Sequence, residues 1–598
     1  MRRPLHRHVI AVFLLFAALF AGAPVTAQDD PESELGEIFF DSVEVNVVNV
    51  DVFVTDRQGN PVHGLTRDDF ELLQDGKPVE VTNFLAVEDG AEGGPGVTVR
   101  DLGTEPINGT AAAPPPAQLP PDQRLHVVIF IDNLNIRPNS RNQVIDRLRR
   151  FLRDSLDNQD RVMLVSFDGS VHILQELTSI PELVQDSLDK LEKASARGMD
   201  IDVERQRILR DIEDVQIDAS AFSDGTAEVF AHQALEAIRT HAAGIQGRTR
   251  FTLNAMSQLV DSLAGLSGRK ALVYVSGGIS LRPGQALFQA WQAKFGQVPN
   301  LVNSVAGAGE TLSYDTTLDY QKLIAKANAN RVIFYTIDAA DSGNFGAVSA
   351  EVGGFDLSAL NTQSAGRTWT SELETVERSG VRQAFQLLAD STGGLAFINT
   401  RGLGKTLGQL ASDFESYYSL GYAPAGDPDG KYHRLEVKLK DGKGYKVRNR
   451  AGYQDKTQDD RMSDRTLSAL LLNAQDNPLG IELERAAGTP EEKGVYTIPL
   501  LLKVPLGQLA LLPDQDYHRG RLSVFIAVRD EKGGTSDVTR IPLPINIPND
   551  KINEALDQYA GYEFKVRMKE GFQRVAVGVR DEVAAVNSTL RLNFRVGG

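Results

Sequence analysis

The stretch Leu125–Asn135 constrains the fold of this chain more than any other. An almost continuous apolar run of strand length ends abruptly in Asp-Asn-Leu-Asn, and apolar residues at helical spacing follow from Asn139. Apolar runs of this kind are typical of central strands covered on both faces, as in parallel sheets. The sequence therefore predicts a buried strand with Asp132 at its carboxyl end, on the edge where open α/β folds bind ligands.

Strand and helix patterns alternate throughout residues 124–414. A polar helical insertion at about 194–250 interrupts the alternation. Repeated strand–helix alternation favours right-handed crossovers and a mostly parallel sheet. We therefore predict an α/β fold class, with a doubly wound, mostly parallel sheet over residues 124–414. The strand-like runs are 125–131, 161–167, 171–177, 271–275, 331–337 and 394–399.

Shorter β segments flank this region. Residues 28–87 carry an alternating strand at Val43–Thr55 and two turns, which is too little β structure to stand alone. Residues 415–455 are again strand-like, so we expect the two segments to pair in one small β domain that contains the α/β domain as an insertion. The Gly-, Pro- and Ala-rich segment 88–123 is predicted to be a linker. Six short strand-like runs in 461–598 favour a C-terminal antiparallel sandwich of immunoglobulin-like type.

Residues 1–27 predict a secretory signal peptide, with three arginines, the apolar core Val9–Phe20 and the small-residue site Val25-Thr26-Ala27. The core is shorter than the roughly 20 residues that span a bilayer. We therefore expect an exported protein, periplasmic or extracellular, with no membrane span in the mature chain. Cleavage removes three positive charges and no negative ones, so the net charge changes from −17 to −20. Such acidity disfavours a nucleic-acid partner, and the absence of cysteine excludes disulfides and Cys-based zinc sites.

These features resemble von Willebrand factor A (VWA) domain proteins and, more narrowly, the VWFA-related exported proteins of Acidobacteria. The resemblance covers about residues 40–455 and depends on several short motifs in a fixed order. It implies an α/β domain that binds a protein ligand at the carboxyl edge of its sheet. The motifs are Val52-Phe53-Val54-Thr55-Asp56, Asp68-Asp69-Phe70, Asp132-Asn133-Leu134-Asn135, Tyr417-Tyr418-Ser419-Leu420-Gly421-Tyr422 and Arg450-Ala451-Gly452-Tyr453.

The family usually carries a metal-ion-dependent adhesion site, with Asp-x-Ser-x-Ser after the first strand, a later Thr and an Asp after the fourth strand. Oxygen ligands there hold Mg²⁺ octahedrally and leave one position for a partner's carboxylate. Here Asp132 matches the first aspartate, but Leu134 and Ile136 replace both serines. Ser276 stands where the later aspartate is expected, and no threonine is assigned. The resemblance therefore implies a degenerate site with Asp132 as the metal residue; the alternative is that Asp132 caps the following loop or helix.

Motifs for enzymatic chemistry are incomplete. Gly402-Leu403-Gly404-Lys405-Thr406 lacks the first glycine of a phosphate loop, because Asn399 occupies that position. The histidines show no His-Glu-x-x-His spacing, and there is no Gly-x-Ser-x-Gly elbow. We therefore predict a non-enzymatic protein that mediates protein–protein binding or adhesion. The alternative is a hydrolase on a similar α/β sheet with unrecognised catalytic residues.

Two further features have a structural and a functional interpretation. The carboxylates and arginines in 199–217 recur at helical spacing, which favours a salt-bridged, solvated helix face. Trp291 and Trp369 are of the residue type that anchors partners, but we expect burial.

Overall fold

The computed structural model describes residues 47–88, 98–101, 124–154, 160–215, 225–296, 308–340, 366–398, 403–426, 428–442, 444–491 and 494–597. Within these ranges the chain forms two compact units. One contains Val47–Asp261 and Ser267–Asp455, and the other contains Ser262–Leu266 and Lys456–Gly598. The predicted signal peptide, and the predicted linker apart from residues 88 and 98–101, lie outside the described residues.

A six-stranded sheet forms the centre of the first unit, in the order β11-β10-β9-β6-β7-β8. Strand β6 is parallel to both of its neighbours, whereas β8 is antiparallel to β7. Every residue of β6, β9 and β10 is buried, which accounts for the mostly apolar sequence of these strands. The strands are β6 (Leu125–Asp132), β7 (Arg161–Phe167), β8 (Val171–Thr178), β9 (Arg269–Ser276), β10 (Val332–Asp338) and β11 (Ala396–Phe397).

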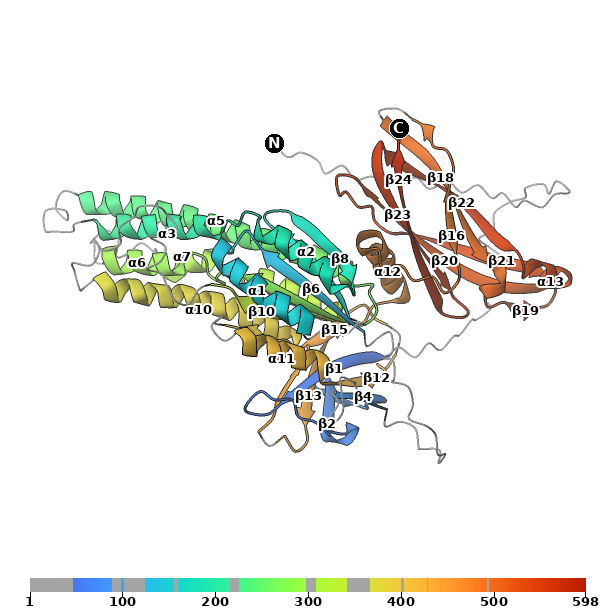
Figure 1. Cartoon of the computed structure of the whole chain (residues 1–598), viewed down its shortest axis with the longest axis horizontal. Helices are drawn as coiled ribbons and strands as arrows, with labels where there is room; N and C mark the ends of the chain where they lie inside the picture. The colour runs from blue at the N-terminus through green and yellow to red at the C-terminus, as the bar shows by residue number, and fades with distance from the viewer. Residues whose placement is uncertain are drawn as a thin grey trace. The chain divides into compact units, whose positions relative to one another are not determined.

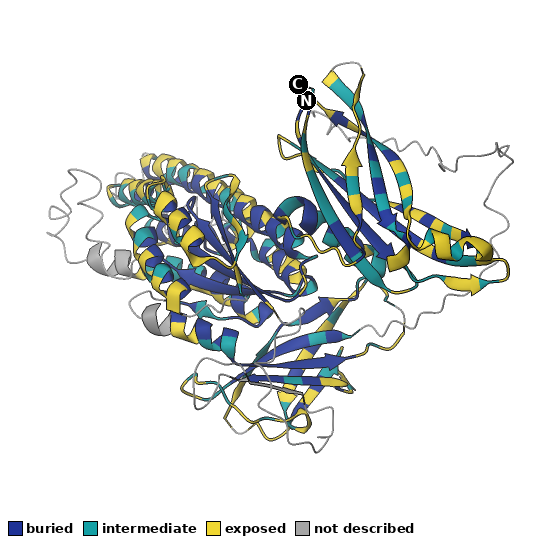
Figure 2. Ribbon diagram, turned by 45° about the vertical axis from the view of Figure 1, so that its right-hand side comes forward, coloured by how far each residue is buried: buried dark blue, intermediate teal, exposed yellow. Residues whose placement is uncertain are grey.

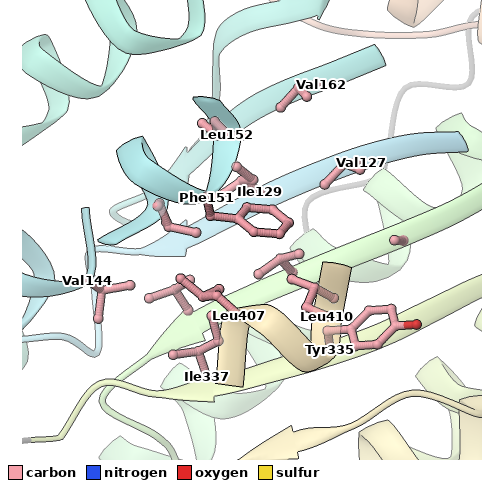
Figure 3. Packing of buried hydrophobic residues seen from close by; sticks show 14 of the residues in the cluster. Val127, Ile129, Val144, Phe151, Leu152, Val162, Tyr335, Ile337, Leu407 and Leu410 are labelled. Atoms are coloured by element: carbon pink, nitrogen blue, oxygen red, sulfur yellow. The ribbon is translucent and has the colours of Figure 1, made fainter. Parts of the chain in front are cut away.

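Helices cover both faces of this sheet. Helices α1 (Pro138–Asp154), α2 (Pro181–Glu192) and α11 (Leu403–Glu415) pack on one face, where Ile129 lies near Phe151 and Leu410 (Figure 3). The opposite face contacts α5 (Thr226–Leu263), α8 (Thr317–Ala329) and α10 (Gly366–Thr392). Figure 2 shows that the buried residues concentrate in the strands between these helices.

A second core lies within a group of helices that extends from the sheet. Helices α3 (Gly198–Glu213) and α6 (Gln285–Phe295) pack there with parts of α5 and α10 (Figure 1). Short α7 (Ala308–Ser313) contacts α6. Ile208, Ile212 and Trp291 are buried in this core, so Trp291 has the expected buried position. The side chain of Trp369 is outside the described part of the chain. We call α3, α5, α6 and α10 the helical extension.

Two small antiparallel sheets complete the first unit, in the orders β14-β1-β12-β4-β5 and β15-β13-β2-β3. Strand β12 lies between β1 and β4, so residues far apart in the sequence share one sheet. Val50, Phe70 and Leu420 belong to the core between the two sheets. The strands are β1 (Val48–Thr55), β2 (Phe70–Gln74), β3 (Lys77–Val79), β4 (Asn83–Glu88), β5 (Thr98–Asp101), β12 (Tyr417–Tyr422), β13 (Tyr432–Leu439), β14 (Lys446–Asn449) and β15 (Gly452–Gln454), with a 3₁₀ turn at Arg67–Asp69.

A buried group of charges joins these small sheets to the six-stranded sheet. The Arg269 guanidinium carbon lies 3.5 Å from the centre of the Tyr417 ring, and the guanidinium donates hydrogen bonds to the backbone carbonyls of Asp413 and Phe414. Arg448 of β14 donates two hydrogen bonds to the Asp413 carboxylate, at 2.6 and 3.0 Å. Arginine suits such positions because its planar fork pairs with carboxylates and stacks on aromatic rings.

The second unit consists of α12 and two antiparallel sheets that enclose a common core. Helix α12 begins in a capping box between Thr457 and Asp460. Its Ala469 and Leu470 pack against Ala527 and Ala576. The elements are α12 (Gln458–Leu472), β16 (Glu482–Arg485), β17 (Thr489–Pro490), β18 (Val495–Pro505), β19 (Leu512–Asp514), β20 (Tyr517–Asp530), β21 (Thr539–Pro548), α13 (Ile552–Ala555), β22 (Tyr559–Lys569), β23 (Gly571–Asp581) and β24 (Val586–Val596), with 3₁₀ turns at Leu506–Gln508 and Asn549–Lys551.

The predicted fold class is wrong. Four of the five sheets in the described residues are antiparallel, and the six-stranded sheet is mixed, so the chain is mostly antiparallel β structure with helices around one sheet. The prediction placed a doubly wound, mostly parallel sheet over residues 124–414. However, only three residues separate β7 from β8, and so short a connection permits only an antiparallel hairpin. Among the described helices, none combines the length and apolar character needed to cross a membrane.

Candidate functional site

The carboxyl edge of the six-stranded sheet brings together three strand ends. Asp132, Ser276 and Asp338 are the last residues of β6, β9 and β10. Asp338 is the register partner of Ser276, and Ile131 is the partner of Val275, so the three ends lie at the same level of the sheet. This edge therefore collects polar side chains from residues that lie far apart in the sequence.

Asp132 is fully buried, and protein groups satisfy both of its carboxylate oxygens. The backbone N–H of Asn135 donates to Oδ1 at 3.2 Å, and the Asn135 side-chain amide donates to both oxygens. The hydroxyls of Tyr274 and Ser276 donate to Oδ2 at 2.8 and 3.0 Å. Burial raises the pKa of Asp132, although these hydrogen bonds act in the opposite direction. Asp132 thus holds the loop after β6 against the end of β9.

The residues around Asp132 do not fit a magnesium ion well. Mg²⁺ needs near-octahedral oxygen ligands and usually keeps several waters, but the carboxylate has no exposed surface. Leu134 and Ile136 are also buried and offer no ligand oxygen. The buried Oδ1 of Asn135 has no hydrogen-bond partner among the described residues, and it is one oxygen ligand at most. The assignment of Mg²⁺ to Asp132 stays a prediction, and the contacts favour the alternative in which Asp132 orders the loop.

Replacing Asp132 with alanine is expected to destabilise the protein without changing its response to magnesium. The change leaves the Tyr274 and Ser276 hydroxyls without their acceptor, and each buried unsatisfied group costs about 1–3 kcal/mol. Calorimetric titration with Mg²⁺ should give no binding heat for either protein, and urea unfolding should show the loss of stability. Asp168→Ala, at an exposed aspartate just after β7, is the matched control. Heat from the native protein that disappears in Asp132→Ala would instead assign a metal site.

The loop after β6 is held by groups that its local sequence alone does not reveal. Arg141 is only 1% exposed and donates hydrogen bonds to the Asn133 side chain and to the carbonyls of Glu192 and Ala194. Gly198 approaches the backbone of Ile136 so closely that an added Cβ would lie 2.5 Å from its carbonyl carbon. A side chain at position 198 would therefore push α3 away from this edge.

A cavity of about 120 Å³ opens beside these strand ends. The loops after β6, β9 and β10 contribute one wall, including Asn135, Gly277 and Ala340. Helices α3, α5, α6 and α10 contribute most of the remainder, so the helical extension and the sheet edge build one pocket. Its charged and ionisable lining residues are Arg137, Asp202, Arg205, His241, Asp338, Glu374, Glu377 and Arg378. We call this cavity the edge pocket.

Sequence patterns did not identify several residues of this site. Tyr274 lies two positions before Ser276 on the same strand face, which is the signal that could have placed it beside Asp132. Thr252 accepts a hydrogen bond from the Asn135 side chain at 3.3 Å, but its position in α5 follows only from the folded arrangement. The same holds for His241, which lies in the predicted polar insertion and is 3% exposed.

A second group of polar residues lies on the small β sheets. In the described part of the chain, Asp429, His433 and Asp455 have ligand atoms that all lie within 4.8 Å of one another. However, the His433 ring faces the Asp75 carboxylate at 2.8 Å through Nδ1 and the Asp429 carboxylate at 3.2 Å through Nε2. Hydrogen bonds to these carboxylates raise the pKa of His433. A protonated ring is not a metal ligand, so this arrangement favours an ion-pair cluster that joins the β2–β3 turn to the start of β13.

This cluster is expected to stabilise the protein most between about pH 4 and 6.5. The raised pKa of His433 adds stability below its unfolded value, and this stability is lost as the pH rises through the folded value. The pKa of Asp75 is lowered by His433, and that of Asp429 is lowered to about 2, mainly by the Lys431 backbone N–H. The stability that Asp75 and Asp429 contribute is present above their unfolded pKa values. It is lost as the pH falls through their lowered folded pKa values. His433→Gln should therefore lower the thermal midpoint more near about pH 5.5 than near about pH 9. His172→Gln, at a more exposed histidine–aspartate pair, should lower the thermal midpoint less near about pH 5.5. An equal effect of both substitutions at this pH would contradict the prediction.

Comparisons with known proteins leave the family open. No family model matches the chain, and no curated protein matches it. A solved structure of the conserved hypothetical protein BatB from Bacteroides thetaiotaomicron matches with 12% identity and a TM-score of 0.15, over 36% of this chain and 65% of that chain. The pilus adhesin SpaC from Lactobacillus rhamnosus GG matches with 8% identity and a TM-score of 0.22, over 91% of this chain and 57% of that chain. The type V pili tip protein Mfa5 from Porphyromonas gingivalis matches with 8% identity and a TM-score of 0.22, over 79% of this chain and 70% of that chain. Scores this low carry no argument about fold or function.

Proposed function

We propose that this chain is an exported, non-enzymatic protein that binds a protein partner at the carboxyl edge of the six-stranded sheet, as an adhesion module related to the VWFA-related exported proteins. The observation that supports the proposal best is the edge pocket, which opens where three strand ends meet. Strand ends of neighbouring parallel strands are the usual ligand position in sheets of this kind.

The composition of the pocket wall is consistent with binding rather than catalysis. Asp132 stands at the end of β6, where a catalytic carboxylate would be expected. It is fully buried and hydrogen-bonded to protein groups. The ionisable groups of the edge pocket come instead mainly from α3, α5 and α10, with Asp338 at the end of β10. An adhesion site needs such charged groups for partner selection.

Site-specific photo-crosslinking tests the proposal. A photoreactive amino acid replaces Ala340 in the edge pocket or, as the control, Glu182 in the first turn of α2. Thr178, three residues before α2, pairs with Val162 at the start of β7, so Glu182 lies at the opposite edge of the sheet. We expect a protein adduct from position 340 and none from position 182 when the full chain is exported in its native cells.

The adduct must also depend on the geometry of the pocket. Ile201→Trp, which fills part of the cavity wall, should reduce adduct formation from position 340. Leu183→Trp, at an exposed residue of α2, supplies the matched control and should leave the adduct unchanged. The same adducts from both photoreactive positions, or no adduct from position 340, would contradict binding at this edge.

A further inference from the structure

The charged residues of the edge pocket differ in how far opposite charges in the pocket wall compensate them. Its lining holds three arginines and four carboxylates. On the α3 side, Arg137 donates two hydrogen bonds to Asp202, and Arg205 lies 3.4 Å from the same carboxylate. These two arginines therefore already have an anionic partner within the wall, which lowers their attraction for an anionic ligand.

Asp338 and Glu377 lie in a different environment. Asp338 is 8% exposed and accepts a hydrogen bond from the backbone N–H of Ala340 in its own loop. Burial raises the pKa of Asp338 despite the attraction of Arg378 and Arg382. Glu377 on α10 is half-buried, and its partial burial also raises its pKa, while Arg205 attracts and Asp202 repels the carboxylate. Both carboxylates thus carry a desolvation cost that the arginines of the wall do not remove, and a cation in the pocket would reduce this cost.

His241 supplies an independent observation at the same pocket. Its side chain is 2% exposed, and neither ring nitrogen has a partner in hydrogen-bond geometry among the described residues, although Nδ1 lies 3.2 Å from a carboxylate oxygen of Glu204. Burial lowers the pKa of His241 and so favours the neutral ring, in which one nitrogen is an acceptor. A buried acceptor without a donor is costly, and an N–H group of a ligand would satisfy it.

The pocket also has an apolar wall and sufficient volume. Ile201, Ile245, Leu287 and Val381 contribute side chains from α3, α5, α6 and α10. The cavity of about 120 Å³ is several times larger than the ~10–15 Å³ that one water molecule requires. Apolar walls with charged groups suit long basic side chains, whose methylene stems pack on apolar surface while the charged head is hydrogen-bonded. A bare metal ion would leave the apolar wall without contacts.

We infer that the edge pocket receives the ammonium or guanidinium group of a lysine or arginine side chain presented by the partner protein. This inference rests on the proposed function and adds the chemical class of the contact. Asp338 and Glu377 accept the charged N–H groups, His241 accepts a further N–H, and the apolar wall contacts the methylene stem.

Three capped tripeptides test the inference directly on the full chain: acetyl-Gly-Lys-Gly-amide, its arginine counterpart and its glutamate counterpart. Saturation-transfer NMR suits such weak ligands, because it detects them while they exchange. The lysine and arginine peptides should bind and the glutamate peptide should not. Glu377→Gln and Asp338→Asn preserve side-chain shape, and each should weaken the binding of the basic peptides about tenfold, because each removes a charge-assisted hydrogen bond.

Glu372→Gln is the matched control. Glu372 is an exposed residue of α10, the helix that carries Glu377, and it is not part of the pocket lining. This variant should bind the basic peptides as the native protein does. Equal binding of the glutamate peptide, or unchanged binding of the basic peptides in both pocket variants, would overturn the inference. If the basic peptides fail while position 340 still yields a specific protein adduct, the inference is wrong and the proposed function stands. If the basic peptides bind but position 340 yields no adduct, the pocket chemistry is correct and the proposed protein partner is wrong.

Discussion

Asp413→Ala is expected to lower the free energy of unfolding of the first unit by about 3–5 kcal/mol, because it leaves the mostly buried guanidinium of Arg448 without the carboxylate that it pairs with. Asp413 is 5% exposed and accepts two hydrogen bonds from Arg448 and one from the Tyr335 hydroxyl. Burial alone would lower the pKa of Arg448, and Asp413 is the largest influence that raises it. Removal of the carboxylate therefore leaves most of the desolvation cost of the guanidinium uncompensated, since only the backbone carbonyls of Gly393 and Gly394 remain as acceptors.

Urea unfolding of the full chain measures this effect, and amide hydrogen exchange assigns it. We expect faster exchange in β14 and β10, which carry Arg448 and Tyr335. Asp189→Ala is the control, since Asp189 pairs with Arg149 in an exposed position and should contribute no more than about 1 kcal/mol. The double variant Asp413→Leu, Arg448→Met should recover much of the loss, because it removes both charges. An Asp413→Ala protein within about 1 kcal/mol of the native protein would show that this pair is not a buried ion pair in solution.

Trp291→Ala is expected to destabilise the helical extension by about 3–5 kcal/mol, as is typical when a large buried aromatic side chain is removed. Trp291 is 1% exposed, and its indole N–H donates to the carbonyl of Ala231 at 2.7 Å. The indole therefore both fills the core of the extension and connects α6 to α5. Trp291→Phe keeps most of the apolar contact area and should cost clearly less.

The location of the effect separates this prediction from general destabilisation. Amide exchange should increase in α3, α5 and α6, while α1 on the opposite face of the sheet should change little. Because Asp202, Arg205 and His241 stand on α3 and α5, binding at the edge pocket should weaken together with this local stability. An equal increase of exchange in α1 would show that the extension does not unfold separately.

Local patterns in the sequence predicted individual elements well where burial is complete. The apolar run 125–131 corresponds to β6 at Leu125–Asp132, and the helical spacing from Asn139 corresponds to α1 at Pro138–Asp154. Both elements are specified by side-chain periodicity, which is local in sequence. The class of the whole fold was wrong because strand direction depends on pairing, and pairing is set by connection length and by contacts between distant strands.

The candidate site shows the same limit. The Asp132–Asn135 contact joins residues three positions apart, so the sequence can suggest it. Tyr274 and Ser276 reach Asp132 from more than 140 positions away, and only the register of β9 against β6 places them there. The carboxylates of 199–217 fitted a solvated helix face by spacing, yet Asp202 pairs with Arg137 at the edge pocket. Tertiary packing decides which charges of such a helix face a cavity, and local spacing does not contain that information.

The position of β12 between β1 and β4 determines how the first unit would respond to a pulling force. Strand β1 begins at Val48, and its partner β14, which ends at Asn449, is followed directly by β15, which ends at Gln454, so the six-stranded sheet and its helices form a loop between the paired strands β1 and β14. Tension applied at Val48 and Gln454 passes first through the hydrogen bonds of β1 with β12 and β14. This route through the paired strands is shorter and stiffer than the route along the intervening chain. The edge pocket therefore lies outside the mechanical load path, and its geometry stays intact until those strands separate.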